Sequence, residues 1–371
     1  MSGFRQDQVN AAHVMVVGCG ALGNEVLKNL VLMGVTHIVA VDFDFVEIGN
    51  LTRSILFTKE DAERHRRKVD VIEERLKQIN TSLEIKTIFG DISFDVGLGL
   101  IRKMDVIIGC VDSRWARYCI NRLAMRAGVP WVDGGIDNLE GTARVFAPGK
   151  NCYACNLGPE GLKELSQRMP CSGIIHRQEL AGSAPTTSII ASVIGAIQVQ
   201  EALKLIQKDF GTSLCGRMLY YEGGHMTVYI ADYQAYDDDC PEHDLWAPVK
   251  ATNVCATMSV KEALSHWYEE LETTDVTLCL TNDCFVDYVS RRDNDERTYV
   301  MQPGRLVEDY IEQDCSLKGL QTNALYQHEY HHIDIEFPYP EHSLAQLGIP
   351  KDDILHVVAD GQDFYLELSN R

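Results

Sequence analysis

The sequence has 371 residues, of which 45% are apolar, and its 34 Lys and Arg against 54 Asp and Glu give a formal net charge of −20 at pH 7. This length leaves room for one large α/β domain and a smaller second domain. The acidic balance argues against binding nucleic acid through its phosphates and against binding an anionic membrane surface, because both need an excess of basic residues.

The chain is expected to be cytosolic and to keep its 12 cysteines reduced. Its first residues lack the apolar core of a signal peptide, and no run of residues approaches the length of about eighteen apolar residues that a membrane span needs. Cysteines in such a chain are typical of free thiols, metal ligands or a nucleophile rather than a disulfide scaffold.

The beginning of the chain carries a nucleotide-binding pattern. An apolar run of strand length enters a G-x-G-x-x-G turn formed by Gly18, Gly20 and Gly23, and a second apolar run ends at Asp42. Glycines permit a tight turn and let the backbone approach a phosphate at a helix N-terminus, while an acid at the end of the next strand accepts from ribose hydroxyls. The pattern predicts a nucleotide-binding fold, although many dehydrogenases share it.

The residues that follow distinguish this chain from a dehydrogenase. Asp44, Asn50 and Arg53 follow the second strand, and Lys68 and Asp112 come later in the chain. This ordered set resembles the adenylating fold of ubiquitin-activating enzymes and of their bacterial relatives in molybdopterin and thiamin synthesis, the ThiF/MoeB type. The resemblance covers roughly residues 12 to 245 and implies an α/β fold with a Rossmann-like, doubly wound sheet.

The resemblance implies adenylyl transfer, in which the C-terminal carboxylate of a small carrier protein attacks the α-phosphate of ATP and releases pyrophosphate. It assigns Arg53 and Lys68 to the phosphates, and Asn50 and Asp44 to orienting the phosphates or the ribose. It assigns Asp112 to the Mg²⁺ that bridges the phosphates. The expected ATP site comprises Gly18, Gly20, Gly23, Asp42, Asp44, Asn50, Arg53, Lys68 and Asp112.

Some of these residues have alternatives. Arg66 competes with Lys68 for the phosphate role, because the loop before them is longer than in the family. Asp112 is alternatively the N-cap of the helix that follows it directly. Asp133 and Asp137 either line a groove for the carrier tail or form a turn.

The first domain contains two short-spaced pairs, Cys152 with Cys155 and, nearly ninety residues later, Cys240 with His243. Two such pairs indicate a closed tetrahedral Zn²⁺ site, and the resembled family places paired cysteines at both points. The last ligand of the family is usually Cys, so His243 is a departure, with Cys215 in reserve. The alternative is that the pairs hold no metal.

Cys171 lies between these pairs, in a segment that resembles the one carrying the thioester-forming cysteine of ubiquitin-type activating enzymes. The resemblance implies that a thiolate at Cys171 attacks the acyl adenylate. Arg168, His176 and Arg177 are the neighbouring groups that would lower its pKa. The segment is too short for the large cysteine domain of eukaryotic enzymes, and an unreactive loop cysteine is the alternative.

The assembly of the chain is predicted from residues 185–206, a long apolar helix rich in small residues that relatives use in the core and at the subunit interface. Relatives usually carry an Arg well before the glycine turn that reaches a neighbouring subunit's ATP site, and Arg5 lies too close to Gly18 to match it. Either Arg5 substitutes, or a partner chain supplies the arginine, or none is used. We expect a homodimer or a heterodimer.

The chain is divided into an adenylation domain, residues 1–247, and a smaller domain, residues 248–371. The second is an α+β unit, in which we predict strands over 276–280, 298–301, 332–337 and 364–368 and a short helix over 306–313. Its closing stretch, from Leu344, resembles the end of the ubiquitin-like fold domain with which activating enzymes recruit conjugating enzymes. A purely structural appendage is the alternative.

Three functions are compatible with these patterns. The first is an activating enzyme that adenylates a ubiquitin-like protein, holds it as a thioester on Cys171 and passes it to a conjugating enzyme. The second is a sulfur-carrier adenylyltransferase that stops at the adenylate, and the third is the non-catalytic subunit of a heterodimeric activating enzyme. Arg53, Lys68 and Asp112 disfavour the third, and Cys171 with the C-terminal domain favours the first over the second.

Overall fold

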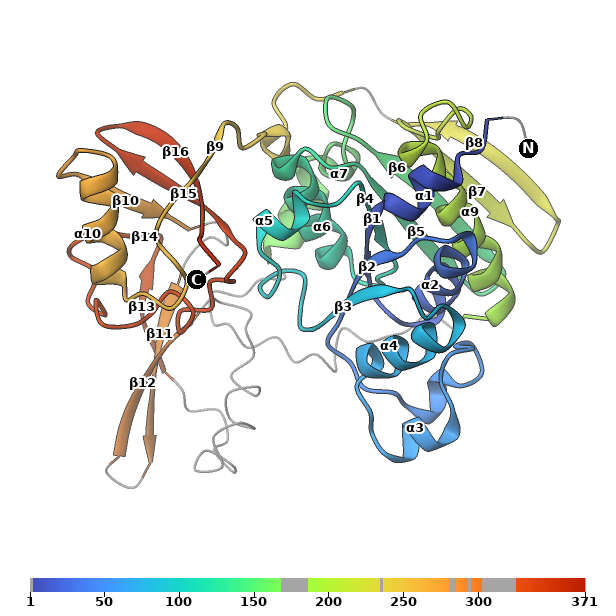
Figure 1. Cartoon of the computed structure of the whole chain (residues 1–371), viewed down its shortest axis with the longest axis horizontal. Helices are drawn as coiled ribbons and strands as arrows, with labels where there is room; N and C mark the ends of the chain where they lie inside the picture. The colour runs from blue at the N-terminus through green and yellow to red at the C-terminus, as the bar shows by residue number, and fades with distance from the viewer. Residues whose placement is uncertain are drawn as a thin grey trace. The chain divides into compact units, whose positions relative to one another are not determined.

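The computed structural model of the chain describes residues 3–167, 186–233, 236–280, 285–292, 295–301 and 325–370. These residues form two compact units, and the main boundary between them falls between Leu245 and Trp246 (Figure 1). Each unit buries a hydrophobic core of its own.

The first unit is built on an eight-stranded sheet, whose strands are β1 (His13–Val17), β2 (His37–Asp42), β3 (Glu84–Phe89), β4 (Val106–Gly109), β5 (Trp131–Asp137), β6 (Glu140–Phe146), β7 (Arg217–Glu222) and β8 (Thr227–Asp232). Their order in the sheet is β3-β2-β1-β4-β5-β6-β7-β8. β1 to β5 are parallel, and β6 to β8 are antiparallel to their neighbours. The strand order reverses between β1 and β4, which is where open α/β sheets bind ligands, outside the carboxyl ends of the strands.

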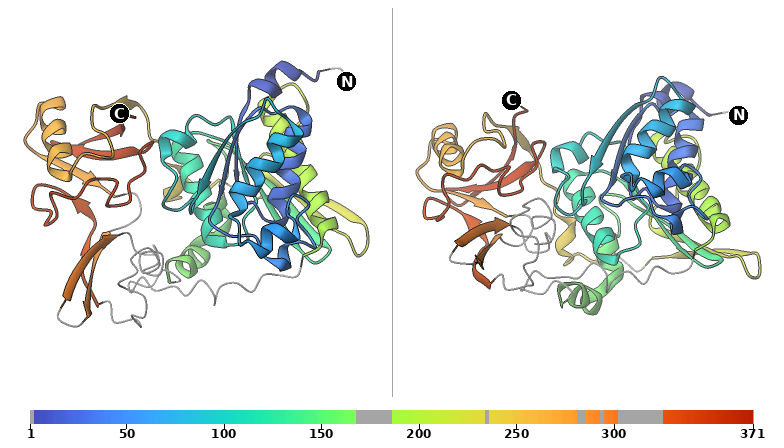
Figure 2. Two further views of the ribbon diagram at one scale, coloured as in Figure 1. Left: turned by 60° about the horizontal axis from the view of Figure 1, so that its bottom comes forward. Right: turned by 90° about the horizontal axis from the view of Figure 1, so that it is seen from below.

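Helices cover both faces of this sheet, with α5 and α6 on one face and α2, α4 and α9 on the other (Figure 2). The helices are α1 (Gln6–Ala11), α2 (Ala21–Met33), α3 (Lys59–Glu63), α4 (Lys68–Ile79), α5 (Leu98–Ile101), α6 (Arg114–Ala127), α7 (Tyr153–Gln167) and α9 (Ser188–Ile206), with the short 3-10 helices η1 (Ile48–Asn50) and η2 (Pro241–His243). Of these, the start of α5 up to Gly99 and the part of α7 from Pro159 onward group with the second unit. The predicted α/β class with a Rossmann-like sheet is confirmed.

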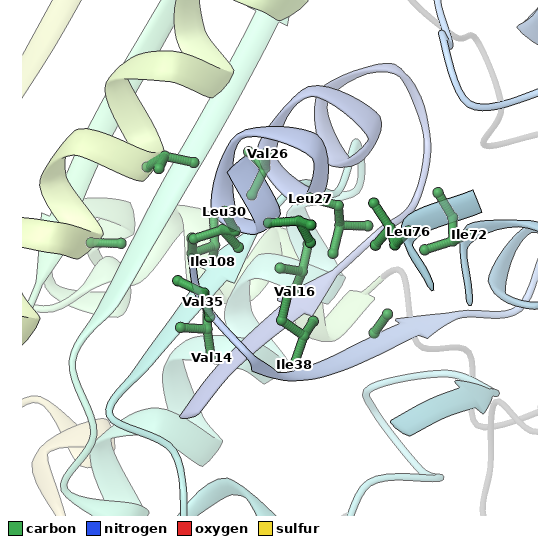
Figure 3. Packing of buried hydrophobic residues seen from close by; sticks show 14 of the residues in the cluster. Val14, Val16, Val26, Leu27, Leu30, Val35, Ile38, Ile72, Leu76 and Ile108 are labelled. Carbon is green, nitrogen blue, oxygen red and sulfur yellow. The ribbon is translucent and has the colours of Figure 1, made fainter. Parts of the chain in front are cut away.

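The core of the first unit lies between the parallel strands and the helices packed on them. Leu27 and Leu30 of α2 point onto Val14 and Val16 of β1, and all four side chains are fully buried (Figure 3). β1 is buried on both faces, as expected for a central parallel strand, and this explains why it reads as a continuous apolar run. The core fixes where β1 ends and hence where the glycine turn begins.

The expectation that no stretch approaches the length of a membrane span needs correction, because helix α9 is long and apolar enough to cross a membrane, by length and composition alone. It has 19 residues with a mean hydropathy of 1.6, and it is the one such helix in the described part of the chain. Half of its most apolar stretch is buried, and it packs against α2, β5 and β6. Ile194 lies where a Cβ at Gly141 of β6 would clash, so the helix sits directly on the sheet. These contacts are those of a core helix.

The second unit has a mixed five-stranded sheet in the order β14-β10-β15-β16-β9 and a three-stranded sheet in the order β12-β11-β13. Its elements are β9 (Val249–Ala251), α10 (Val260–Glu270), β10 (Val276–Cys279), β11 (Phe285–Arg292), β12 (Asp295–Met301), β13 (Leu325–Tyr330), β14 (His332–Ile333), β15 (Ile354–Ala359) and β16 (Gln362–Glu367). It is an α+β unit, as predicted.

One predicted strand of this unit needs correction, the strands β9, β11, β13 and β15 and the helix α10 were not predicted, and one predicted helix lies outside the described residues. The strand predicted over 332–337 ends at Ile333, because Asp334 turns the chain and its carboxylate accepts from the backbone N–H of Glu336 at 2.9 Å. Helix α10 was missed, although Ser259 and Glu262 form a capping box at its start. The helix predicted over 306–313 lies outside the described residues.

Candidate nucleotide site and metal-binding cluster

The turn between β1 and α2 is tightly packed on one side and open on the other. Gly18 has a φ of +93°, and a Cβ there would lie 2.5 Å from the carbonyl oxygen of Cys110. A Cβ at Gly23 would clash with the carbonyl oxygen of Gly18, whereas a Cβ at Gly20 would meet nothing within 4 Å. Packing thus requires the first and third glycines, while the second leaves open space before the N-terminus of α2, where a phosphate would bind.

Asp42 ends β2, and its carboxylate holds the glycine turn. The backbone N–H groups of Cys19 and Asp44 donate to its two oxygens, each at 2.7 Å. Burial raises the pKa of Asp42, and the positive charge of Lys68 opposes this shift. The structure therefore gives Asp42 a role in shaping the turn that the sequence did not predict. Its role toward a ribose stays a prediction.

Lys68 lies beside Asp44, with 2.7 Å between Nζ and Oδ2, and its side chain is only 9% exposed. The backbone fixes this position, because the N–H of Lys68 donates to the carbonyl of Asp44 and the N–H of Val46 donates to the carbonyl of Arg66. Burial by itself would lower the pKa of Lys68, but the carboxylates of Asp42 and Asp44 together raise it. The side chain is therefore charged at neutral pH, as a phosphate ligand must be.

Arg66, the competitor of Lys68, is engaged elsewhere. Its guanidinium donates to Asp61 at 2.9 Å and to Glu74 at 2.8 Å. Asp61 is almost fully buried and also lies 3.5 Å from Arg75. Arg66 therefore ties α3 to α4, and the geometry favours Lys68 as the phosphate-binding residue.

Asn50 and Arg53 lie in the loop that follows β2. The Oδ1 of Asn50 accepts from the N–H of Glu47 at 3.0 Å, so this side chain shapes η1. The N–H of Arg53 donates to the carbonyl of Asn50 at 3.1 Å. Arg53 is half-buried, and no described residue forms an ion pair with its side chain. A guanidinium in that state is available to an anion.

Asn24 is a site residue that the sequence reasoning missed. It is fully buried in the first turns of α2, and its amide donates to the carbonyls of Cys19 at 2.8 Å and Gly20 at 3.0 Å. Its Oδ1 accepts from the N–H of Leu56 at 2.9 Å. One side chain thus joins the glycine turn to the loop that carries Arg53. The sequence signal that could have revealed this role is the polar side chain of Asn24 among the apolar residues of α2.

Asp112 follows β4, and its carboxylate is exposed at the same edge of the sheet as the glycine turn. The alternative reading of Asp112 as a helix cap is wrong. The N-cap of α6 is Ser113, whose Oγ accepts from the N–H of Ala116 at 3.2 Å.

Neither reading of Asp133 holds. It lies within β5 and is completely buried, so it forms no turn and lines no exposed groove. Arg117 lies 2.9 Å and Arg144 2.5 Å from its two oxygens. Two arginines compensate the burial of this carboxylate. Asp137, at the end of the same strand, is exposed.

Arg5 lies away from the glycine turn. It forms an ion pair with Asp209 at 3.0 Å, just after the end of α9. The start of α9 is near the carboxyl end of β5, where Thr187 donates to the carbonyl of Asn138. The end of α9 and Arg5 are therefore at the amino ends of the strands. This disfavours Arg5 as a ligand of the nucleotide bound by its own chain.

Cys152, Cys155, Cys240 and His243 come together, and their ligand atoms all lie within 4.8 Å of one another. The Cys152 sulfur is 3.7 Å from that of Cys155 and 3.8 Å from that of Cys240. A tetrahedron with Zn–S bonds of about 2.3 Å has an edge of about 3.8 Å, so the spacing fits a bound Zn²⁺. Cys215, the reserve ligand, is not part of the cluster.

Helix α6 supports both halves of this cluster. The hydroxyl of Tyr118 donates to Glu242, which lies between Cys240 and His243 in η2. Asn121 accepts from the N–H of Tyr153, between the first two cysteines, at 2.9 Å. Burial raises the pKa of Cys240 and Cys152 and lowers that of His243. A bound cation would offset the burial of thiolates here.

The predicted thioester residue, Cys171, lies outside the described residues, as do Arg168, His176 and Arg177.

Comparison with known proteins places the first unit in a family. The sequence model of the ThiF family matches residues 2–242. The chain is 28% identical over 236 residues to the SAMP-activating enzyme E1 of Haloferax volcanii, which covers 64% of this chain and 82% of that protein. It is 30% identical over 223 residues to the sulfur carrier protein adenylyltransferase of Thermus thermophilus, covering 58% and 77%.

Solved structures show the same fold. The crystal structure of E. coli MccB with ATP is similar with a TM-score of 0.52 and 21% identity, and the match covers 64% of this chain and 68% of that chain. The family match extends over more than half of the sequence and includes the glycine turn, Lys68, Asp112 and the paired cysteines. The chain therefore belongs to the ThiF family.

Proposed function

We propose that this chain uses ATP and Mg²⁺ to adenylate the C-terminal carboxylate of a small ubiquitin-like or sulfur-carrier protein. The observation that carries the proposal is the buried Lys68, held charged by Asp44 at the edge of the sheet where the glycine turn opens. Two relatives, a SAMP-activating enzyme and a sulfur carrier protein adenylyltransferase, are named for this kind of activation.

The site supplies cations and dipoles rather than a base. A carboxylate is already ionised, so it attacks the α-phosphorus directly, forms the acyl-phosphate bond of the adenylate, and pyrophosphate leaves with the electron pair of the broken P–O bond. Lys68, Arg53 and the N-terminus of α2 would stabilise the charge on the phosphate oxygens. Asp112, with an exposed carboxylate, fits a ligand of Mg²⁺, which would neutralise the phosphates.

We propose a structural Zn²⁺ on Cys152, Cys155, Cys240 and His243. The four side chains complete a tetrahedral ligand set without water, and the three cysteines are buried. The pairs are far apart in the sequence, so the cation would join α7 to η2. Nothing in this arrangement exposes a position for substrate.

We further propose that the adenylate is converted to a thioester on Cys171 and passed to a conjugating enzyme recruited by residues 248–371. The sequence around Cys171 and the ubiquitin-like closing stretch of the C-terminal domain support this second step. A sulfur-carrier adenylyltransferase that stops at the adenylate is the alternative. A dimer, with itself or with an arginine-donating partner, is part of the same proposal.

The experiment uses the full chain, ATP, Mg²⁺ and a panel of ubiquitin-fold proteins with Gly-Gly C-termini from the same genome. Each is paired with a version lacking the terminal Gly-Gly. Intact mass spectrometry should find the adenylated carrier, and denaturing gels without reductant should find an enzyme–carrier adduct that thiol reductant cleaves.

Cys171→Ala should abolish the adduct and leave the adenylate, because adenylation uses Arg53, Lys68 and Asp112. An adenylate without any adduct in the wild type would support the sulfur-carrier alternative. If no member of the panel is adenylated although the chain binds ATP, the proposed function is wrong.

A further inference from the structure

Arg117 joins the carboxyl ends of two adjacent strands of the large sheet. Its Nε donates to Asp133 at 2.9 Å, and its Nη2 donates to the carbonyls of Val111 at 2.7 Å and Gly134 at 3.1 Å. Its Nη1 lies 3.4 Å from the carbonyl of Asp112. The side chain is 12% exposed, so it acts on the protein rather than on a ligand in solvent.

These contacts fix the backbone on both sides of the Asp112 carboxylate. The parallel ladder between β1 and β4 ends at Cys110, whose N–H donates to the carbonyl of Val17 at 2.7 Å. Beyond that point the carbonyls of Val111 and Asp112 both accept from Arg117. In the described part of the chain no side chain binds the Asp112 carboxylate, so its position depends on its backbone.

We propose that Arg117 is a positioning residue, which holds the Asp112 carboxylate in place for the divalent cation that binds with ATP. This role rests on the proposed function. A cation ligand needs its geometry fixed to about 0.5 Å, and loss of a supporting partner typically weakens metal binding about 10- to 100-fold. A lysine cannot replace the arginine, because the donors of an ammonium all sit on one nitrogen, whereas the planar guanidinium spans acceptors on both strands with Nε and Nη2.

The anchor of Arg117 supplies a matched control. Asp133 is completely buried and is shared with Arg144 of β6, which lies 2.5 Å from its second oxygen. Arg144→Lys therefore perturbs the same buried carboxylate without touching the segment around Asp112. Arg117→Lys keeps a cation near Asp133 but loses the fork that binds the carbonyls of Val111 and Gly134.

The first measurement is the affinity for α,β-methylene-ATP as a function of Mg²⁺ concentration, by titration calorimetry, with melting temperatures recorded in the same buffer. Arg117→Lys should need about 10- to 100-fold more Mg²⁺ for half-maximal binding. Arg144→Lys should keep the wild-type Mg²⁺ requirement. Pyrophosphate exchange by Arg117→Lys should recover to within a few-fold of wild type at saturating Mg²⁺.

A double-mutant cycle separates positioning from direct contact. If Arg117 acts through Asp112, then Arg117→Lys should cost little further Mg²⁺ affinity in an Asp112→Ala background. Multiplicative losses would overturn the proposal. The proposal would also be wrong if the wild type binds nucleotide normally and the Arg117→Lys variant needs no more Mg²⁺ than the wild type does. Absence of nucleotide binding by the wild type would instead overturn the proposed function.

A second variant guards against misfolding. Arg117→Gln combined with Asp133→Asn removes one arginine and the buried carboxylate together, and the amide oxygen introduced at position 133 leaves Arg144 an acceptor. The folded double variant should show the same rise in the Mg²⁺ requirement. Unchanged Mg²⁺ dependence in this variant would overturn the positioning role.

Discussion

Asn24→Ala tests whether one buried amide holds the nucleotide site together. The substitution removes the donor to the carbonyls of Cys19 and Gly20 and the acceptor for the N–H of Leu56. The carbonyl of Gly20 still accepts from the backbone N–H of residue 24 at 2.9 Å. The two buried backbone groups that lose their partner are therefore the carbonyl of Cys19 and the N–H of Leu56. At about 1–3 kcal/mol for each unsatisfied group, the expected destabilisation is about 3 kcal/mol.

For a unit of this size, about 3 kcal/mol corresponds to a fall in melting temperature of about 6–12 °C, which scanning calorimetry resolves. Asn29→Ala is the matched control, because Asn29 lies half-buried on the same helix and makes no hydrogen bond through its side chain with the described residues. Its melting temperature should stay close to that of the wild type. An Asn24→Ala protein that melts within about 2 °C of the Asn29→Ala protein would show that the hydrogen bonds of Asn24 do not stabilise the nucleotide site.

The remaining predictions concern charge and metal. Lys68→Met should lower the rate of pyrophosphate exchange by about 10²-fold or more. Arg66→Met should lower the stability of the fold and leave the exchange rate largely intact. Loss of exchange in Arg66→Met but not in Lys68→Met would make Arg66 the phosphate ligand. Chelation of Zn²⁺, or Cys155→Ser, should lower the melting temperature without abolishing ATP binding, and metal analysis should find one Zn²⁺ per chain. Burial would raise the pKa of the Asp61 carboxyl, but hydrogen bonds from Thr58 and Arg66 lower that pKa overall. The ionised carboxylate therefore stabilises the fold at pH values above the pKa of the unfolded state, about 3.9. This stabilisation is lost as the pH falls through the pKa of the folded state. The stability difference between wild type and Asp61→Asn should therefore be large at pH 7 and shrink below about pH 4, as urea unfolding at several pH values would measure.

The parts of the site that could be predicted from the sequence are those that local chemistry dictates. Gly18 has a left-handed φ of +93° and a Cβ at Gly23 would clash with the carbonyl of Gly18, so the local turn requires glycine at both positions, and the G-x-G-x-x-G spacing shows this in the sequence. Cys152 and Cys155 are close in the sequence, so their spacing alone indicates that both can bind one metal ion. The ambiguity between Lys68 and Arg66 was resolved only by the backbone pairing that places Lys68 against Asp44.

The rest depended on contacts between distant residues. Asn24 looks like a poor helix former until its bond to Leu56 is seen, and the sequence gives no sign of that contact. The sequence alone predicts a groove or a turn at Asp133, because the ion pair with Arg144 that compensates its burial joins residues paired between antiparallel strands. Helix α10 is different, since its capping box at Ser259 and Glu262 is a local signal that the sequence itself carries.

Adenylation of a carrier by this chain is measured by ATP–pyrophosphate exchange. With a Gly-Gly-terminated ubiquitin-fold protein, the wild type should catalyse exchange that depends on both the carrier and Mg²⁺. Arg53→Ala and Asp112→Ala should each lower the rate by about 10²–10³-fold, because each removes a charged group that acts on the phosphates in the transition state. Wild-type exchange rates in both variants would show that Arg53 and Asp112 do not act on the phosphates and that adenylation does not take place at this site.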